Sequence, residues 1–337
     1  MPPGQDSGHL RGGFDWEAYV DGLVRRLGTL TAVAEHLSAE RRHAESIASI
    51  ERGLRRLRRT DHGDGGVWGR RTLAAFGLPR AVVDRVRWMG LYHSRFTDLP
   101  VPVASDLLRL WDRPPVRGSV AGAYVDLGLA STALRGGDPE RAEQHLARIG
   151  RHAPLEAVVE RALVQAFLWS RTDDARSLAA LEEAEPLLGS PALSEHSRAC
   201  MTARWIDQQA WRLNRGRAGA PDHYGALALY ARLPSDGPAF ARCRRHNGLG
   251  WTLHRMGRTA EAREHARSAV ETAGDAGLLR LRAMALRLLA VVSDGPEAER
   301  ARERSAHIAV ELDDRILRDR FERPEIPASA VQGPLPS

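Results

Sequence analysis

Residues 242–274 read RCRRHNGLGWTLHRMGRTAEAREHARSAVETAG, and this stretch decides the fold of most of the chain. Apolar and small side chains recur in it every three to four positions, which is the periodicity of an α-helix. The small residues Gly250, Ala262 and Ala269 allow two helices to approach closely, and Gly257 lies between the helices where a turn is needed. The stretch therefore predicts a pair of packed helices joined by a short turn.

The same order of residues appears earlier in the chain, as Leu127-Gly128, Gly137 and Ala142. Both stretches resemble the tetratricopeptide repeat, a helix–turn–helix unit of about 34 residues. Units of this kind bury their apolar faces only against one another. The resemblance therefore implies an all-α fold, with a right-handed solenoid of helical hairpins and a small N-terminal helical domain. The first helices of successive pairs are expected to begin near residues 119, 155, 192, 237 and 276. A helical bundle of similar composition is the alternative.

Composition divides the chain into five predicted parts. They are a tail (1–13), a helix-turn-helix-like domain (14–60), a helical connector (61–116), the repeat domain (117–315) and a second tail (316–337). The connector is bounded by a glycine-rich run on one side and a pair of prolines on the other. The second tail is rich in proline, which disfavours further helix.

The N-terminal domain carries the most specific indication of function. The apolar periodicity of this domain predicts three helices, over residues 14–27, 29–37 and 43–59. The run Ile47-Ala48-Ser49-Ile50-Glu51-Arg52-Gly53-Leu54 resembles the recognition helix of a phage-repressor-type helix-turn-helix, and this resemblance implies DNA binding. Four arginines share the helix face opposite the apolar residues and are the candidate DNA contacts: Arg52, Arg55, Arg56 and Arg59.

Two observations weigh on this interpretation. All 49 basic residues are arginine, and residues 41–71 hold nine of them against four acidic residues, so their net charge of +5 nearly equals the +6 of the whole chain. A local basic patch of this kind is typical of nucleic-acid binding. However, the segment Ser38–Glu45 lacks glycine and is longer than the turn of the family. An arginine-rich face on a helix that caps the solenoid is the alternative.

A second set of candidate residues lies on the predicted inner face of the repeats, where Arg244, Asn247, Trp251 and His254 project from one first helix. Guanidinium and amide groups bind carboxylates, and an aromatic ring adds apolar contact area. The pattern predicts a concave groove for a peptide, a protein segment or another small anionic ligand. Neighbouring helices are expected to add further polar residues to it: Arg204, Gln208, Arg282 and Arg287.

Other classes of function find little support in the sequence. The two cysteines, Cys200 and Cys243, have no CxxC partner and are expected as small buried side chains in a reduced cytoplasm. The histidines show no metal-ligand spacing and no catalytic motif is present, so the sequence predicts no enzyme, no metal and no cofactor. No stretch approaches the roughly 20 apolar residues of a membrane span. Four tryptophans lie in apolar helical runs and are expected in the core: Trp88, Trp111, Trp169 and Trp205.

These patterns together predict a cytoplasmic DNA-binding transcriptional regulator, in which the repeat domain senses a peptide or small effector. The order of its parts resembles that of peptide-sensing bacterial regulators, which implies a homodimer. A repeat scaffold that recruits a protein partner and does not bind DNA is the alternative. A third, weaker interpretation is an accessory protein that binds RNA or nucleotides through the basic patch.

Overall fold

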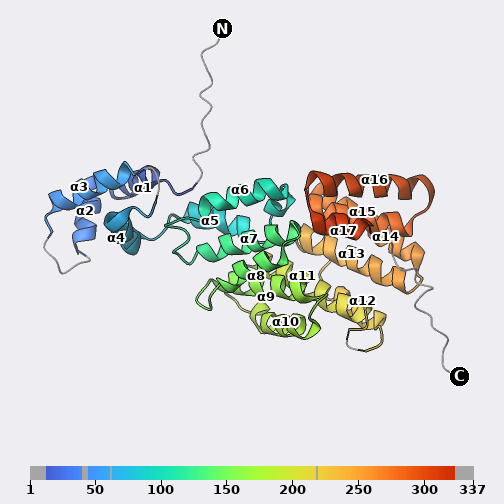
Figure 1. Cartoon of the computed structure of the whole chain (residues 1–337). Coiled ribbons are helices and arrows are strands. Elements are labelled where there is room, and N and C mark those ends of the chain that lie inside the picture. The colour runs from blue at the N-terminus through green and yellow to red at the C-terminus, as the bar shows by residue number, and fades with distance from the viewer. Residues whose placement is uncertain (1–12, 40–44, 61–62, 218, 323–337) are drawn as a thin grey trace, which may run out of the picture. The chain divides into compact units, whose positions relative to one another are not determined.

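The computed structural model describes residues 13–39, 45–60, 63–217 and 219–322, and these contain seventeen α-helices, one short 3₁₀ helix (η1, Arg95–Asp98) and no strand (Figure 1). The predicted all-α class is confirmed. The chain divides into two compact units. Unit 1 comprises residues 1–90 with 106–125, and unit 2 comprises residues 91–105 with 126–337. Two helices, α6 (Val101–Trp111) and α7 (Gly122–Arg135), each contribute residues to both units.

Unit 1 begins with three short helices that enclose an apolar core. They are α1 (Trp16–Leu27), α2 (Leu30–Ala39) and α3 (Ile47–Arg58). Asp15 and Ser46 cap the first and third of these, because each side chain accepts a hydrogen bond from a backbone N–H of the first turn. The three predicted helices are present, but residues 40–44 of the long turn lie outside the described residues. The buried core side chains are Trp16, Tyr19, Val20, Leu23, Val33, Ala34, Leu37, Ile50, Leu54 and Leu57.

The next helix, α4 (Gly66–Phe76), is tied to this core rather than standing apart from it. The indole N–H of Trp16 donates to the carbonyl of Gly63 at 3.1 Å, and the Tyr19 hydroxyl donates to the carbonyl of Gly77 at 2.8 Å. Trp68 of α4 also packs against the core. Unit 1 is completed by α5 (Arg80–Gly90) and by its shares of α6 and α7.

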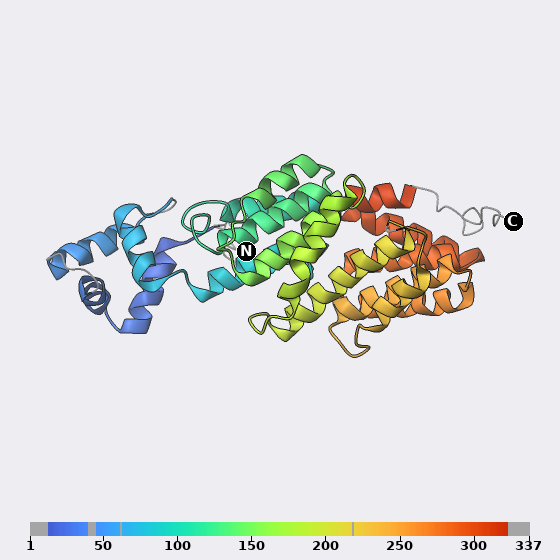
Figure 2. The ribbon, with the colours of Figure 1, turned by 90° about the horizontal axis from the view of Figure 1, so that it is seen from below.

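Unit 2 consists of helices that pack pairwise in chain order, with α9 against α10, α11 against α12, α13 against α14 and α15 against α16 (Figures 1 and 2). The first helices of these pairs begin at residues 155, 195, 239 and 279, within three residues of the predicted starts. The bounds are α8 Pro139–Ala147, α9 Leu155–Trp169, α10 Asp174–Leu188, α11 Glu195–Asn214, α12 His223–Ala231, α13 Ala239–Arg255, α14 Thr259–Asp275, α15 Leu279–Val292, α16 Gly295–Glu311 and α17 Arg315–Glu322.

Small residues let these helices approach closely, as the sequence predicts. Ala262, Ala266 and Ala269 are fully buried on α14. A Cβ atom on Gly250 of α13 would lie 2.6 Å from a methyl group of Leu288, so any larger residue there would displace the Leu288 side chain. Gly257 has φ of +75° between α13 and α14, a conformation that side chains disfavour.

Two predictions of the sequence need correction. Residues 316–322, which were expected in the second tail, belong to α17, which continues to Glu322 and buries Leu317 completely. Its first turn is capped by Asp314, which accepts a hydrogen bond from the Leu317 N–H at 3.1 Å. Among the tryptophans expected in the core, Trp111 and Trp205 are buried, but Trp88 is 47% exposed. None of the described helices combines the length and the apolar composition that crossing a bilayer requires.

Candidate functional site

Unit 2 contains two adjoining cavities, of about 60 and 190 Å³, that share Phe167, Asp207, Gln208, Met284 and Arg320 in their walls. One water molecule needs about 10–15 Å³ by this measure, so the larger cavity has room for a small molecule. Among the described residues, ten arginines line the two cavities and Asp207 is the one acidic residue that does. These arginines are Arg135, Arg171, Arg204, Arg212, Arg215, Arg244, Arg255, Arg280, Arg287 and Arg320.

The cavity walls repeat from one helix to the next. On α13 and α15 the lining residues are spaced by three or four positions, so each set lies on one face of its helix. On α11 they are more closely spaced and cover a broader side of the helix. An arginine begins each set, at Arg204, Arg244 and Arg280. Residues farther along each helix follow it, and they are Asp207, Gln208, Trp211, Arg212 and Asn214 on α11, Asn247, Trp251 and Arg255 on α13, and Met284 and Arg287 on α15.

Asp314 holds two of the arginines in a buried ion-pair network. Its carboxylate lies 3.0 Å from Arg135 Nε and 2.8 Å from Arg280 Nε, and its side chain is fully buried. Burial alone would raise the pKa of Asp314, but the guanidiniums of Arg280 and Arg135 hold it below the ordinary value. Asp314 thus ties both guanidiniums into the fold, although its single negative charge balances only one of their two positive charges.

Two further arginines are also paired internally. Arg204 contacts the fully buried carboxylate of Glu160, and Arg244 contacts Asp207. Both guanidiniums also lie against the ring of Tyr92, with distances to its centroid of 4.2 Å for Arg204 and 5.6 Å for Arg244. Cation–π contact of this kind adds to the ion pairs and fixes both side chains.

Arg320 differs from these four. Its guanidinium has no ion pair or hydrogen bond to the residues that the structure describes, and it lies 5.6 Å from the ring centroid of Phe167. Burial, together with repulsion from the guanidiniums of Arg280 and Arg171, lowers the pKa of Arg320 to about 9. The surroundings thus disfavour its positive charge, and an anion in the cavity would stabilise that charge.

Two polar acceptors in the same walls lack a donor. The side-chain oxygens Gln208 Oε1 and Asn247 Oδ1 are buried and accept no hydrogen bond from any described residue. Buried polar atoms are nearly always hydrogen-bonded, so each of these oxygens indicates a group that the cavity accommodates. The cavities therefore offer the Arg320 guanidinium to an anion and two oxygens to N–H or O–H donors.

The structure brings most of the predicted groove residues together. Arg244 lies in the wall of the smaller cavity, and Asn247 and Trp251 lie in that of the larger one. His254 is not in either wall but stands beside Trp251, with ring centroids 6.0 Å apart. Of the four additional candidates, Arg204, Gln208 and Arg287 line the cavities, whereas Arg282 lies in a separate depression on α14 and α15.

Sequence reasoning missed Tyr92, Arg135, Arg280 and Arg320. Arg280 lies on the first helix of its pair, as Arg204 and Arg244 do, and all three line the smaller cavity. Arg320 fell in the predicted tail.

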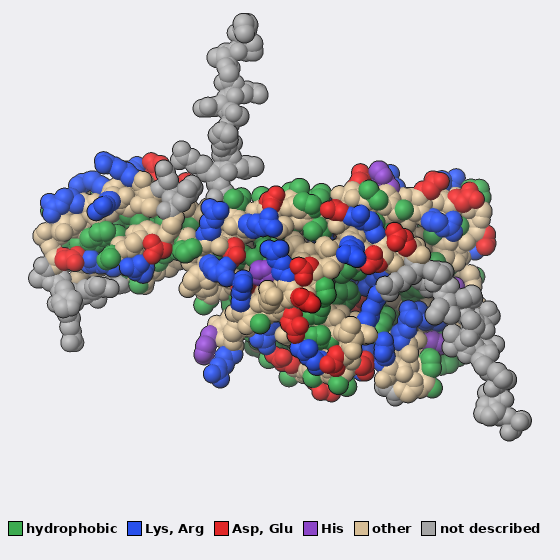
Figure 3. All heavy atoms as spheres, viewed as in Figure 1, with side chains coloured by type: hydrophobic (Ala, Val, Ile, Leu, Met, Phe, Trp, Pro, Cys, Tyr) green, Lys and Arg blue, Asp and Glu red, His purple; other side chains and the backbone are tan. Residues whose placement is uncertain are grey.

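The second candidate surface is the outer face of α3 in unit 1. Arg52, Arg55, Arg56 and Arg59 are all exposed. Basic side chains, blue in Figure 3, gather over this helix. Arg55 lies 2.7 Å from Glu51 in an ion pair, while the other three have no ion pair within the described part of the chain. Three guanidiniums on this face are thus available to phosphates.

Contacts within unit 1 fix the orientation of α3. Glu51 accepts a hydrogen bond from the Thr31 hydroxyl of α2 at 2.6 Å, and this bond and the ion pair with Arg55 hold the pKa of Glu51 below its ordinary value. On the inner side Gly53 is so close to Trp68 of α4 that a Cβ atom would lie 2.0 Å from the indole. Arg71 covers the same indole from 4.5 Å and pairs with Glu45 at 2.6 Å.

Comparison of the chain with protein-family models, with curated proteins and with solved structures found no match.

Proposed function

We propose that the protein is a cytoplasmic DNA-binding regulator and that the cavities of unit 2 bind its effector, a small molecule or peptide that carries a carboxylate or another anionic group. Unit 2 is then an irregular tetratricopeptide-like solenoid, and α3 of unit 1 is the helix that contacts DNA. The observation that carries the proposal is Arg320, a guanidinium in a cavity wall without a carboxylate partner among the described residues.

The chemistry of the cavity defines the effector further. Arg320 matches an anionic group, Gln208 Oε1 and Asn247 Oδ1 match N–H donors, and Trp211 and Trp251 offer apolar area. A short peptide or an acylated amino acid combines all three features. Regulation requires that this ligand bind two arrangements of the protein with different affinity.

The DNA-binding part is supported by exposure and charge. A guanidinium that makes no internal ion pair can neutralise a phosphate or read a guanine edge. Arg52, Arg56 and Arg59 meet this condition within the described residues, whereas Arg55 must leave Glu51 to do so.

Replacing Arg52, Arg56 and Arg59 with Ala is expected to weaken DNA binding and flatten its salt dependence. Each lost phosphate contact reduces the slope of log K against log salt by about 0.9, so three contacts reduce it by about 2.7. Fluorescence anisotropy of a labelled duplex, measured from low to moderate salt, gives both quantities.

A matched control is the triple variant Arg300→Ala, Arg302→Ala and Arg304→Ala, which removes the same charge from exposed positions of α16. It should retain the slope of the parent. Equal losses in both triple variants, or no binding by the parent at low salt, contradict a DNA-binding role of α3 and favour the interaction scaffold.

Replacing Arg320 with Met is expected to abolish anion binding without loss of stability. The parent should be stabilised by phosphate relative to chloride at equal ionic strength, by about 2.7 kcal/mol at one hundred times the Kd. The variant should show no such difference, and its ligand-free unfolding free energy should equal or exceed that of the parent, since an unmatched charge is removed. Urea denaturation followed by circular dichroism measures both.

Arg302→Met, the same change on the exposed face of α16, is the control for a general charge effect. Peptides with free and with amidated C-termini then distinguish a carboxylate ligand from an inorganic one. If Arg320→Met responds to phosphate as the parent does, the cavity is not the anion site. If the ligand-free variant is strongly destabilised, Arg320 serves the fold.

A further inference from the structure

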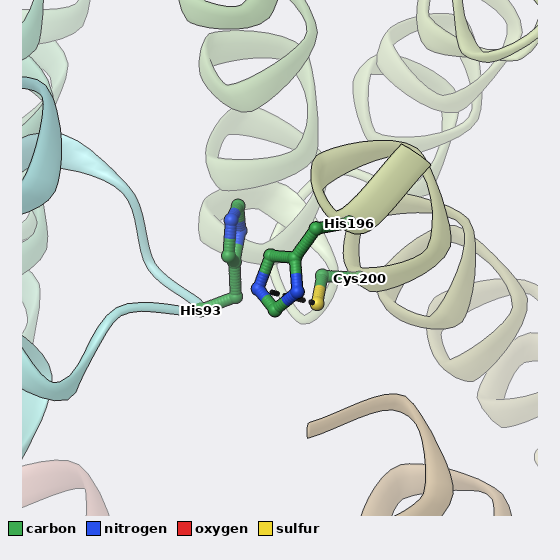
Figure 4. A group of neighbouring side chains, drawn as sticks. All are labelled: His93, His196 and Cys200. Atoms are coloured by element: carbon green, nitrogen blue, oxygen red, sulfur yellow. Dashed lines mark hydrogen bonds between the residues drawn. The ribbon is translucent and has the colours of Figure 1, made fainter. Parts of the chain in front are cut away.

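Three potential metal ligands meet in unit 2 at a place separate from the arginine cavities. His196 and Cys200 lie one turn apart on α11, and His93 approaches them from the segment between α5 and η1 (Figure 4). One ligand atom from each residue lies within 4.8 Å of the other two. His93 and Cys200 are buried, whereas His196 is exposed.

The distances fit a shared ion. Zn–S bonds of about 2.3 Å and Zn–N bonds of about 2.0–2.1 Å place the sulfur and nitrogen of a tetrahedral site about 3.6 Å apart. The separation between Cys200 Sγ and His196 Nε2 is 3.7 Å. The rings of His93 and His196 have centroids 5.6 Å apart and are tilted by 54°, so small side-chain rotations bring a nitrogen of each to the same point.

A nucleophilic role of the thiol is a poor explanation for this grouping. Burial, reinforced by the nearby carboxylate of Glu160, raises the pKa of Cys200 to about 12. A protonated thiol does not attack, because the thiolate is the nucleophile. The second buried cysteine, Cys243, is not part of such a group among the described residues, and its thiol donates to the carbonyl of Ala269.

We propose that His93, His196 and Cys200 bind one Zn²⁺ ion through two imidazole nitrogens and one thiolate. Two nitrogens and a sulfur suit zinc, which prefers such mixed ligands in tetrahedral geometry. On binding, the Cys200 proton leaves to solvent and the sulfur takes up the metal bond. Three protein ligands leave the fourth position to water or to another small ligand.

The ion would link two parts of unit 2 that lie about a hundred residues apart in sequence. His93 belongs to the segment that also carries Tyr92, the ring that Arg204 and Arg244 contact. Zinc therefore fixes this segment against α11 and stabilises the folded state, since it binds the folded chain more tightly than the unfolded one.

Titration of the untagged full-length chain with Co²⁺, followed by competition with Zn²⁺, tests the site. We expect one equivalent of Co²⁺ to produce a sulfur-to-cobalt charge-transfer band in the near ultraviolet and intense tetrahedral d–d bands, and Zn²⁺ to remove both. Zn²⁺ should also raise the melting temperature. A cobalt spectrum without the charge-transfer band overturns the proposal, because it places the metal on imidazoles elsewhere.

Cys200→Ser and Cys243→Ser form a matched pair of buried cysteine variants. The first should lose the charge-transfer band and weaken Zn²⁺ binding at least about tenfold, and the second should retain both. His196→Ala changes an exposed side chain, so it tests the site even if Cys200→Ser folds poorly. It should keep the metal-free melting temperature of the parent and lose the zinc-induced rise. Unchanged zinc affinity in His196→Ala contradicts the site.

Discussion

Replacing Asp314 with Asn is expected to lower the free energy of unfolding of unit 2 by about 3–5 kcal/mol, because it leaves two buried guanidiniums without a counter-charge. Arg135 is 2% exposed and Arg280 is 5% exposed, so bulk solvent reaches little of either side chain. Urea denaturation followed by circular dichroism measures the loss. Because the pKa of Asp314 is lower in the folded state than in the unfolded one, its stabilising effect is complete above the ordinary carboxyl pKa and is lost as the pH falls below it.

Asp313→Asn is the control, at the neighbouring position. Asp313 is exposed and pairs with Arg318 at the surface, where an ion pair contributes about 0–1 kcal/mol. Its φ of +48° is one that Asn tolerates well, so the backbone adds little cost. Similar losses in the two variants would mean that the buried network of Asp314 is not the source of the effect.

The fold of unit 2 was largely predictable because short-range rules determine it. Gly257 ends one helix and Gly250 admits the side chain of Leu288, and both roles follow from the absence of a Cβ atom. The starts of the first helices follow from the same repeated pattern. The sequence did not predict α17, because this helix is held by tertiary contacts, namely burial of Leu317 and the cap from Asp314.

The candidate site was predictable only in part. A helical period places Arg244, Asn247 and Trp251 on one face, and the structure finds all three in the cavity walls. The period does not reveal which guanidinium already has a carboxylate partner. Arg244 is matched by Asp207, whereas Arg320 has no match among the described residues, and this difference depends on distances between helices.

The histidine–cysteine group illustrates the same limit. The spacing of His196 and Cys200 by four residues places both on one face of α11, and the sequence shows this directly. The third ligand, His93, is about a hundred residues away in the chain, and only the packing of its segment against α11 brings it close. A local search for metal-ligand spacing therefore misses the group.

The arginines of the cavity walls include some that form internal ion pairs and one, Arg320, that forms none with the described residues. Those paired with Asp314, Glu160 and Asp207 should respond to substitution mainly through stability, because each loses an internal ion pair. The effect should be largest for Arg204, whose loss leaves the buried Glu160 carboxylate unmatched. Arg320 should respond mainly through ligand binding. Measuring stability and anion binding on the same variants therefore tests the proposed site more sharply than either measurement alone.

In unit 1, Gly53→Ala is expected to lower the free energy of unfolding by about 1–3 kcal/mol or more, as overpacking of a core does. The added Cβ would lie 2.0 to 2.5 Å from three atoms of the Trp68 indole. The indole has little room to move away, because Arg71 lies over its ring and its other side packs against the core. Thermal and urea denaturation of the variant measure the loss. The clash should also displace α3, and the arginines on its outer face, from α4.

Gly22→Ala in α1 should instead raise the free energy of unfolding, although the substitution is the same. The nearest atom to its added Cβ is the flexible end of Arg25 at 3.8 Å, so nothing obstructs it. Alanine in a helix interior is about 0.5–1 kcal/mol more favourable than glycine, and this gain should appear in full. The double variant Gly53→Ala with Trp68→Leu should recover part of the loss, because a smaller side chain removes the steric conflict. If Gly53→Ala stabilises unit 1 as Gly22→Ala does, α3 and α4 do not pack as closely as the structure places them.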